Sequence, residues 1–382
     1  MGLDAVLAWR ELRTAALRSR WTKERIIQTP RSSPPAASAR PGLVDAGREN
    51  AAALARQIAR HCAAYREPQT ARAVGQLLNT LAPFLLLCAA TLWCAAAGYW
   101  APALLLDLPA GGLLVRLFII QHDCGHGSFL PSRTMNDRLG RALSLLTVTP
   151  YDSWKRAHAL HHASNGDLSR RGTGDIVTLT VREYLALPPL GRLRYRFYRN
   201  PLVLIVLGQP LNFLVLQRLP ACVGLPWRTA FRDVMSLNAG LLVLWGALAF
   251  AAGGIGPVLL GILPAIVIAS WIGGWLFYVQ HQYEDTIWDQ SDDWDFHHAA
   301  LGGSSYYVLP RVLQWFTGNV GLHHVHHLNS RIPNYRLQEC LDGHELLGQV
   351  GRLTLRESLA CVRLALWDED ARKLVGFSQV RA

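Results

Sequence analysis

The chain has 382 residues, of which 51% are hydrophobic and only 17% charged, whereas about a quarter of a soluble protein is usually charged. The apolar residues are massed in a few blocks between strongly basic loops, which indicates an integral membrane protein with substantial cytosolic parts. The net charge of +11 does not indicate nucleic acid as a partner, because the arginines flank apolar blocks as the positive-inside rule requires.

Residues 1–65 predict a cytosolic N-terminal extension that is partly disordered. An amphipathic helix over about 4–20 leads into Thr29-Pro-Arg-Ser-Ser-Pro-Pro, which is typical of a linker. A second helical stretch, about 44–64, carries arginines at helical intervals and is expected to be a surface helix. The start of the chain carries charge throughout and has no apolar core before a cleavage site, so it is not a secretory signal.

Four apolar stretches then approach the roughly 20 residues that a membrane-spanning helix needs; they lie at about 74–97, 102–121, 234–251 and 255–279. They form two hairpins whose turns lack Lys and Arg, whereas the loop between the second and third spans is rich in arginine. The positive-inside rule therefore places both ends of each hairpin on the cytosolic face, and we expect the bacterial inner membrane.

The predicted fold is an all-α integral membrane protein in which four transmembrane helices are capped by a cytosolic helical domain. The main domain spans 66–345, and 346–382 form a C-terminal cytosolic helical tail. A fifth apolar stretch, Pro201–Leu219, is interrupted by Gln209, Pro210 and Asn212. We expect it to lie in the interface or to dip partway into the bilayer, because a full span would split the histidines described next between the two faces.

Nine histidines form three clusters and a single residue: His122 and His126; His158, His161 and His162; His323, His326 and His327; and His281. Spacings of three or four residues put the rings of a cluster on one face of a helix. Histidine is the commonest metal ligand, and imidazole suits Zn, Cu, Fe and Ni. Nine rings are too many for one structural zinc and about right for two ions with four or five nitrogens each.

Other polar residues near the clusters are expected to support the ligand rings by hydrogen bonds, as metal-bound histidines usually require; they are Asp123, Asp175, Asn319 and His324. His324 lies about 100° off the face of His323 and His327, so it is expected beside the metal ligands and not among them. The remaining histidines are expected to be surface residues (His61 and His344) or structural ones (His297 and His298).

The clusters carry a resemblance to a known family. His122-Asp-Cys-Gly-His-Gly-Ser-Phe129, His158-Ala-Leu-His-His162 and His323-His-Val-His-His327 resemble the three histidine boxes of the membrane fatty acid desaturases. Further segments, among them Val279-Gln-His-Gln-Tyr283 and His326-His-Leu-Asn-Ser-Arg-Ile-Pro-Asn-Tyr335, are similar to the bacterial acyl-lipid branch, including its Δ12 (omega-6) members. The match covers about residues 65–340.

This resemblance implies two non-haem Fe ions, held by the eight box histidines and by a ninth, for which His281 occupies the family's place. It implies an O2-dependent reaction that removes two hydrogens from adjacent methylenes of a membrane-lipid acyl chain and leaves a cis double bond. Candidate walls for an acyl-chain tunnel are aromatic: Trp154, Trp271, Trp275 and Tyr278. The double-bond position, the chain length and the carrier cannot be inferred from the sequence.

The implied reaction also needs two electrons from elsewhere. The chain contains no C-x₄-C-x₂-C ferredoxin pattern, dinucleotide-binding glycine motif or fused haem domain. We therefore expect a separate electron donor, ferredoxin or cytochrome b5-like. Such donors are commonly acidic, and the basic segment with Arg192, Arg194 and Arg196 is a hypothetical docking surface.

Two other functions fit part of the pattern. A membrane di-iron hydroxylase or ketolase acting on alkanes, sterols or carotenoids would use the same oxidant, and only the family resemblance favours desaturation. A transition-metal transporter would need ionisable residues in the middle of its spans. The span centres are apolar and the histidines lie outside them, which disfavours transport.

Overall fold

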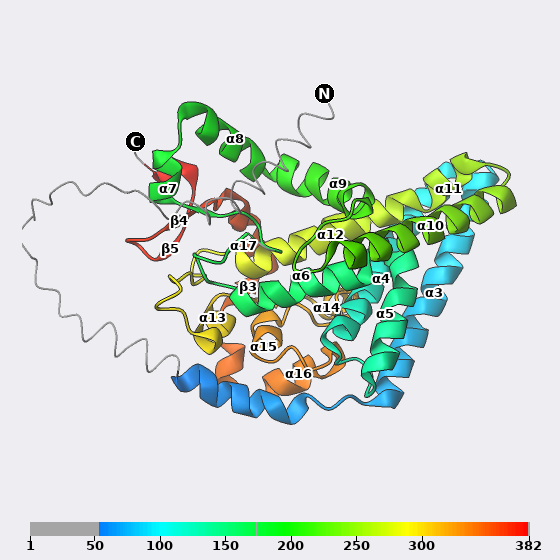
Figure 1. The fold of residues 1–382 in the computed structure, drawn as a ribbon. Helices are drawn as coiled ribbons and strands as arrows, with labels where there is room; N and C mark the ends of the chain where they lie inside the picture. Colours follow the sequence, from blue (N-terminus) through cyan, green and yellow to red (C-terminus); the bar gives the residue numbers. More distant parts are fainter. Residues whose placement is uncertain (1–52, 173, 381–382) are drawn as a thin grey trace, which may run out of the picture.

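The computed structural model describes residues 53–172 and 174–380 (Figure 1). The amphipathic helix predicted at 4–20 and the linker after it lie outside this part. The described chain begins with a helix over residues 53–62, within the stretch expected to be helical, and continues into the short 3-10 helix η1 (Ala63–Tyr65). This N-terminal helix packs into a hydrophobic core, where Ile58 and Cys62 are fully buried.

Four long apolar helices form the two predicted hairpins; they are α3 (Thr70–Ala96), α4 (Trp100–His126), α10 (Trp227–Ala251) and the bent pair α11 (Ile255–Gly261) with α12 (Leu263–His281). The sequence placed the end of the second span five residues too early. Helix α4 continues to His126 and ends at Gly127, whose φ of 68° is the left-handed conformation that glycine adopts freely. The first histidine cluster therefore lies on the last turns of a membrane helix.

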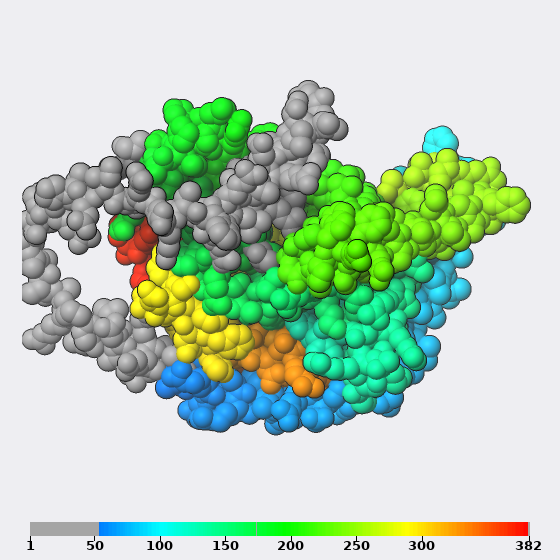
Figure 2. All heavy atoms as spheres, viewed as in Figure 1, coloured from blue at the N-terminus to red at the C-terminus, as the bar shows by residue number. Residues whose placement is uncertain are grey.

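Helix α4 is the central span. Inside the molecule, 61% of its apolar window is buried, against 11% for α10, whose Leu242, Val243 and Phe250 are exposed. An apolar side chain is stable in such a position when lipid surrounds it. Helices α10 and α11 project from one end of the molecule (Figure 2), as the arms of a hairpin that crosses the bilayer would.

The interrupted apolar stretch forms a bent segment and not a straight helix. It comprises α8 (Pro189–Arg199), the π-helix η2 (Leu202–Leu207), α9 (Gly208–Leu214) and the 3-10 helix η3 (Leu216–Arg218). The two parts meet at 62°, and the side chain of Gln209 packs against Gly274 of α12, where a Cβ would come within 2.2 Å of it. This shape agrees with a segment that lies in the interface or dips partway into the membrane.

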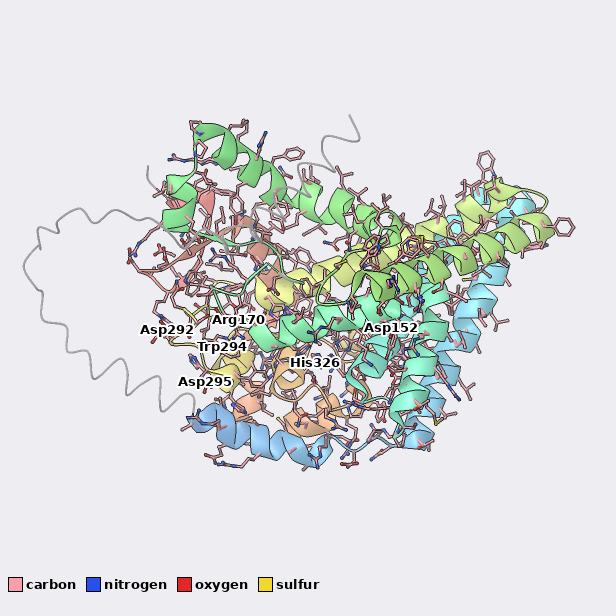
Figure 3. The ribbon with its side chains drawn as sticks, viewed as in Figure 1. Asp152, Arg170, Asp292, Trp294, Asp295 and His326 are labelled. Atoms are coloured by element: carbon pink, nitrogen blue, oxygen red, sulfur yellow. The ribbon has the colours of Figure 1, made fainter. Side chains whose placement is uncertain are left out.

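The cap consists of short helices, which are α5 (Arg133–Thr147), α6 (Tyr151–Ser164), α7 (Val181–Ala186), α13 (Phe296–Gly302), α14 (Arg311–Phe316), α15 (His323–Leu328), α16 (Asn334–Asp342) and α17 (Leu355–Ser358), with the 3-10 helices η4 (Glu345–Gly348), η5 (Leu359–Arg363) and η6 (Phe377–Gln379). Figure 3 places His326 near the middle of the molecule, away from Asp292, Trp294 and Asp295 at its edge. The cap thus surrounds the histidine boxes.

The expectation of a purely helical C-terminal tail is wrong. Residues after 345 include three strands, β3 (Arg352–Thr354), β4 (Leu366–Asp368) and β5 (Lys373–Val375). β4 pairs antiparallel with β5 and parallel with β1 (Leu179–Thr180), while β3 runs parallel to β2 (Tyr306–Val308). β3 and β4 each pair in parallel with a strand more than 40 residues away along the chain, which local periodicity cannot indicate.

Candidate metal centre

All nine predicted ligand histidines meet in the structure, in two adjacent groups. One group contains His122, His126, His158, His162 and His326, and the other contains His161, His281, His323 and His327. Within each group, one ligand atom from every residue lies within 4.8 Å of the others. His324, which was expected beside the ligands, belongs to neither group.

Each of the two H-x-x-H-H boxes contributes histidines to both groups. On α6, His158 and His162 are one turn apart and join the five-histidine group, while His161 turns to the other group. On α15, His323 and His327 are one turn apart and join the four-histidine group, while His326 turns to the first. On each helix, the two histidines that are four residues apart point to one group, and the third grouped histidine, between them, points to the other. One short helix can therefore serve two sites.

The ring nitrogens converge at hydrogen-bond distances. The Nε2 atom of His281 lies 3.1 Å from that of His161 and 3.0 Å from that of His323. In the other group the Nε2 atom of His162 lies 3.1 Å from those of His158 and His326. A neutral imidazole carries a single N–H, so several lone pairs in each group face one another, and a cation between them would satisfy them all.

The opposite side of several rings is fixed by hydrogen bonds. Nδ1 of His122 donates to Asp123 Oδ1 at 3.0 Å, and Nδ1 of His281 donates to the Gly303 carbonyl at 2.9 Å. Nδ1 of His161 donates to Asp175. Donation from Nδ1 selects the tautomer whose Nε2 lone pair is free for a metal and also fixes the ring orientation. Asp123 and Asp175, which were expected to support ligand rings, each accept a hydrogen bond from one ring.

The electrostatics favour neutral rings. Burial, followed by the nearness of the other rings, lowers the pKa well below the ordinary histidine value at five ligands outside the membrane helices: His158, His162, His323, His326 and His327. Neutral imidazole is the form that binds metal. Nitrogen donors in sets of four and five, without a carboxylate in either set, fit Fe, Cu, Ni or Zn rather than Mg or Ca. The residues present therefore fit two transition-metal ions.

Two of the expected supporting residues have other partners. The Asn319 amide donates to the Asn334 carbonyl at 3.0 Å, so it supports that segment and not a ring. His324 hydrogen-bonds through Nε2 with the Leu347 carbonyl at 2.8 Å, and burial lowers its pKa to about 4. The sequence missed Asn334, which holds Asp123 through its backbone and side-chain nitrogens. Its position after the third box was visible, but its distant partner was not.

The histidines expected away from the metal lie outside both groups. His61 and His344, however, are half-buried and not fully on the surface. Nε2 of His61 lies 3.0 Å from the Cys340 carbonyl. The rings of His61 and His344 are 5.1 Å apart. The reason is the N-terminal helix, which packs against α16 and carries His61 with it. His298 lies 3.8 Å from Asp289.

Of the aromatic residues expected to line an acyl-chain tunnel, only Trp154 touches the ligand rings, stacking on His158 at 4.8 Å. The other three lie on α12 and make their hydrogen bonds with residues other than the ligand histidines. Trp271 donates to the Val206 carbonyl, Trp275 donates to the Tyr307 hydroxyl, and the Tyr278 hydroxyl donates to the C-terminal segment.

The sequence analysis missed two aromatic rings, each of which lies four residues before a ligand on a membrane helix. The Phe118 ring lies 5.3 Å from that of Trp154, and the Phe277 ring lies 5.5 Å from that of His281. The i−4 spacing from a ligand is the signal that would have found them.

Comparison with known proteins agrees with this geometry. The family model for fatty acid desaturases matches residues 98–349. The fatty acid desaturase of Bacillus subtilis is 39% identical over 330 residues, which cover 85% of this chain and 92% of the relative. The sn-1 acyl-lipid omega-3 desaturase (ferredoxin) of Synechocystis is 28% identical, over 67% of this chain and 74% of the relative. The sn-1 oleoyl-lipid 12-desaturase of the same organism is 26% identical, over 60% and 64%.

Proposed function

The chain belongs to the fatty acid desaturase family, and we propose that it introduces a cis double bond into a membrane-lipid acyl chain, with O2 as co-substrate. The observation that carries the proposal is the pair of histidine groups at the ends of apolar helices long enough to cross a membrane. The named relatives are desaturases, which favours this reaction over hydroxylation, ketolation or metal transport.

The two histidine groups would hold two non-haem iron ions, one in each group. Bound there, iron supplies the oxidising power that breaks unactivated C–H bonds and that no amino-acid side chain provides. The protein's own part is orientation: Asp123, Asp175 and the Gly303 carbonyl hold three rings so that their Nε2 lone pairs converge.

The location of the centre follows from chain parity. All nine histidines gather on one side only if the bent segment α8–η3 does not cross the bilayer, and its 62° bend supports that arrangement. The arginine-rich loops lie on the same side of the spans as the histidines, so we place this side in the cytosol and the protein in a bacterial inner membrane.

The acyl chain would reach the centre from the bilayer past an aromatic layer. Phe118 on α4, Trp154 on α6 and Phe213 on α9 are in ring contact, at 5.3 Å and 6.1 Å. In the same way, the Phe277 ring on α12 lies 5.5 Å from the ring of His281, which follows it by four residues. Such rings would position a hydrocarbon chain and keep water away from the reacting carbons.

The electrons would come from a separate protein, ferredoxin or cytochrome b5-like; a ferredoxin is named for the Synechocystis omega-3 relative. The docking surface suggested by the sequence needs revision. Arg192 donates to the carbonyls of Leu185 and Leu187, and Arg196 donates to the Tyr184 hydroxyl. Reversing these two charges would break internal bonds, so Arg194, which is exposed, is the residue to reverse in a docking test.

The function is tested by expression in a host that lacks polyunsaturated lipids, followed by gas chromatography of the acyl chains. We expect new double bonds, whose position also gives the regiospecificity; hydroxylated chains would instead support a hydroxylase. Alanine at any of the nine grouped histidines should abolish the product. His297→Ala is the matched control, because this histidine lies outside both groups, and it should leave the product unchanged.

A further inference from the structure

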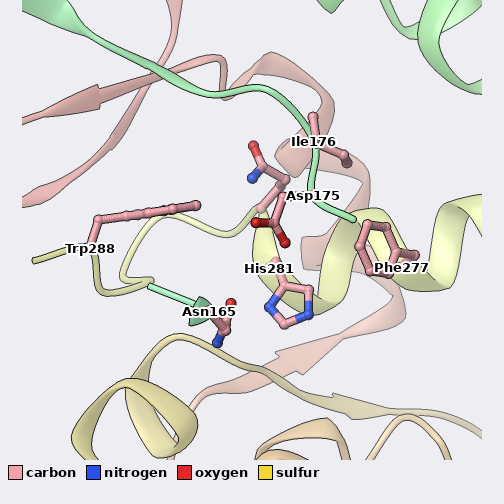
Figure 4. Close-up of a pocket in the computed structure, with 7 residues that line it drawn as sticks. Asn165, Asp175, Ile176, Phe277, His281 and Trp288 are labelled. Carbon is pink, nitrogen blue, oxygen red and sulfur yellow. The ribbon is translucent and has the colours of Figure 1, made fainter. Parts of the chain in front are cut away.

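A small cavity lies directly beside the four-histidine group (Figure 4). Its volume is about 10 Å³, which is roughly the space that one water molecule needs. Seven residues line it: Asn165, Asp175, Ile176, Phe277, His281, Gln282 and Trp288. Two of these residues, Ile176 and Phe277, are apolar, and the other five carry polar groups.

Two of these polar residues are already satisfied by the protein. His281 donates from Nδ1 to the Gly303 carbonyl at 2.9 Å, and its Nε2 atom points to the other rings. Gln282 accepts from Arg199 at 2.7 Å through Oε1, and its amide nitrogen donates to Thr178 at 3.2 Å. His281 therefore has partners on both ring nitrogens, and Gln282 has a partner on both its amide oxygen and its amide nitrogen.

Three polar atoms remain for the cavity. In the described part of the chain, Asp175 Oδ2 and Trp288 Nε1 have no protein hydrogen-bond partner, although both are buried, and Trp288 is only 4% exposed. The amide nitrogen of Asn165 is turned to Gly303 and Ser304 at 3.3–3.4 Å, which leaves its oxygen for the cavity, as Figure 4 shows. An unmet buried polar atom costs about 1–3 kcal/mol.

The residues that line the cavity therefore offer one N–H donor and two oxygen acceptors that the described part of the protein leaves without a partner. We propose that it binds a single water molecule, which accepts from Trp288 Nε1 and donates to Asp175 Oδ2 and Asn165 Oδ1. The chemistry excludes other occupants. A cation would face the indole N–H, an anion would face two oxygens, and an apolar gas would satisfy none of the three atoms.

This water gives Trp288 a positioning role. The same Asp175 carboxylate accepts from His161 with its other oxygen, so a water on Oδ2 holds the carboxylate plane and, through it, the His161 ring. Trp288 thus acts on the four-histidine group through the water and Asp175, without touching a ligand. The positioning role rests on the proposed metal centre, whereas the water site itself does not.

The first test is the water itself. A crystallographic or electron-microscopy map of the full-length wild-type protein, at a resolution that shows ordered water, should show a peak between Trp288 Nε1 and Asp175 Oδ2. A cavity without a peak overturns the proposal. This result does not depend on activity, so a chain that binds the water and makes no unsaturated lipid would refute the proposed function alone.

The second test removes the donor. Trp288→Phe keeps an aromatic ring and loses the N–H. We expect the peak to disappear and the affinity for Co²⁺, followed by its absorption spectrum, to fall about tenfold at one of two sites, as for other partners behind a metal ligand. Trp367→Phe is the control, because Trp367 packs in the same apolar cluster as Trp288 and does not line the cavity. Equal Co²⁺ affinities in wild type and Trp288→Phe would refute the positioning role.

Discussion

Asp123 joins two distant parts of the chain: one carboxylate oxygen holds His122, and the other holds Asn334. The first contact, to His122 Nδ1, is 3.0 Å, and Asp123 Oδ2 accepts from the backbone and side-chain nitrogens of Asn334 at 2.6 Å and 2.8 Å. Asn334 begins α16, seven residues after His327, the last histidine of the third box. The carboxylate thus sets the position of α4 relative to the segment that follows α15, and with it the distance between two boxes.

Asp123→Asn should therefore weaken the five-histidine group. An amide can accept from His122 with its oxygen, but its nitrogen then faces two N–H donors of Asn334, and one pair must separate. We expect affinity for metal in this group to fall by about 10–100-fold, measured as metal bound per purified chain against a competing chelator. Asp152→Asn is the control, because Asp152 pairs with Arg141 away from the histidines. Unchanged metal binding in Asp123→Asn would contradict the role.

Much of this site follows from helical periodicity. The spans and the boxes were predictable because an apolar block or an i, i+4 pair is a local pattern, whereas His281 was expected as the ninth ligand from the family resemblance. The assignment of His161 and His326 to the group opposite to their neighbours was not predictable, because it depends on how α6 and α15 face each other. The bond from Trp275 to the Tyr307 hydroxyl was not predictable for a related reason: a sequence shows that a residue is on a helix but not which neighbour its side chain meets.

A glycine fixes the packing of α5 against α6. A Cβ at Gly140 would lie 2.2 Å from the ring of Tyr151, and this ring is 1% exposed and cannot move outward. Gly140→Ala should destabilise the protein by about 1–3 kcal/mol through overpacking, and the thermal midpoint in detergent should fall. Gly75→Ala is the control, because α3 leaves open space there. A midpoint for Gly140→Ala at or above that of Gly75→Ala would show that the helices separate easily.

The C-terminal segment is attached to the rest of the cap by Arg199. This buried guanidinium donates to Gln282 Oε1 at 2.7 Å and to the Leu364 carbonyl at 2.8 Å. Arg199→Met would remove both of these hydrogen bonds and leave the Leu364 carbonyl with only the Tyr278 hydroxyl and Gln282 Oε1 with only the Thr178 hydroxyl, at a cost of about 1–3 kcal/mol in all. We expect faster limited proteolysis after residue 359. The exposed Arg194, on the same helix, gives the control Arg194→Met, which should be cut at the wild-type rate; equal rates in both variants would contradict this attachment.

The metal-free protein should lose stability as the pH falls below the pKa of an ordinary histidine. Burial lowers the pKa of box histidines such as His158 and His323 in the folded chain, so at pH 5.5 the unfolded chain binds protons that the folded chain does not. Stability then rises with pH through this window and is complete above the unfolded pKa of about 6.5. Each ring that stays neutral contributes a slope of up to about 1.4 kcal/mol per pH unit.

Thermal midpoints of chelator-treated protein from pH 7.5 to 5.5 measure this slope. Replacing His323 with Gln removes one titrating ring and keeps a polar side chain, so its slope should be shallower than that of the wild type. His297→Gln, outside both groups, should keep the wild-type slope. A midpoint that does not change between pH 7.5 and 5.5 would mean that the rings accept protons in the folded state, and a site that opens so readily to water could not keep water away from an acyl chain.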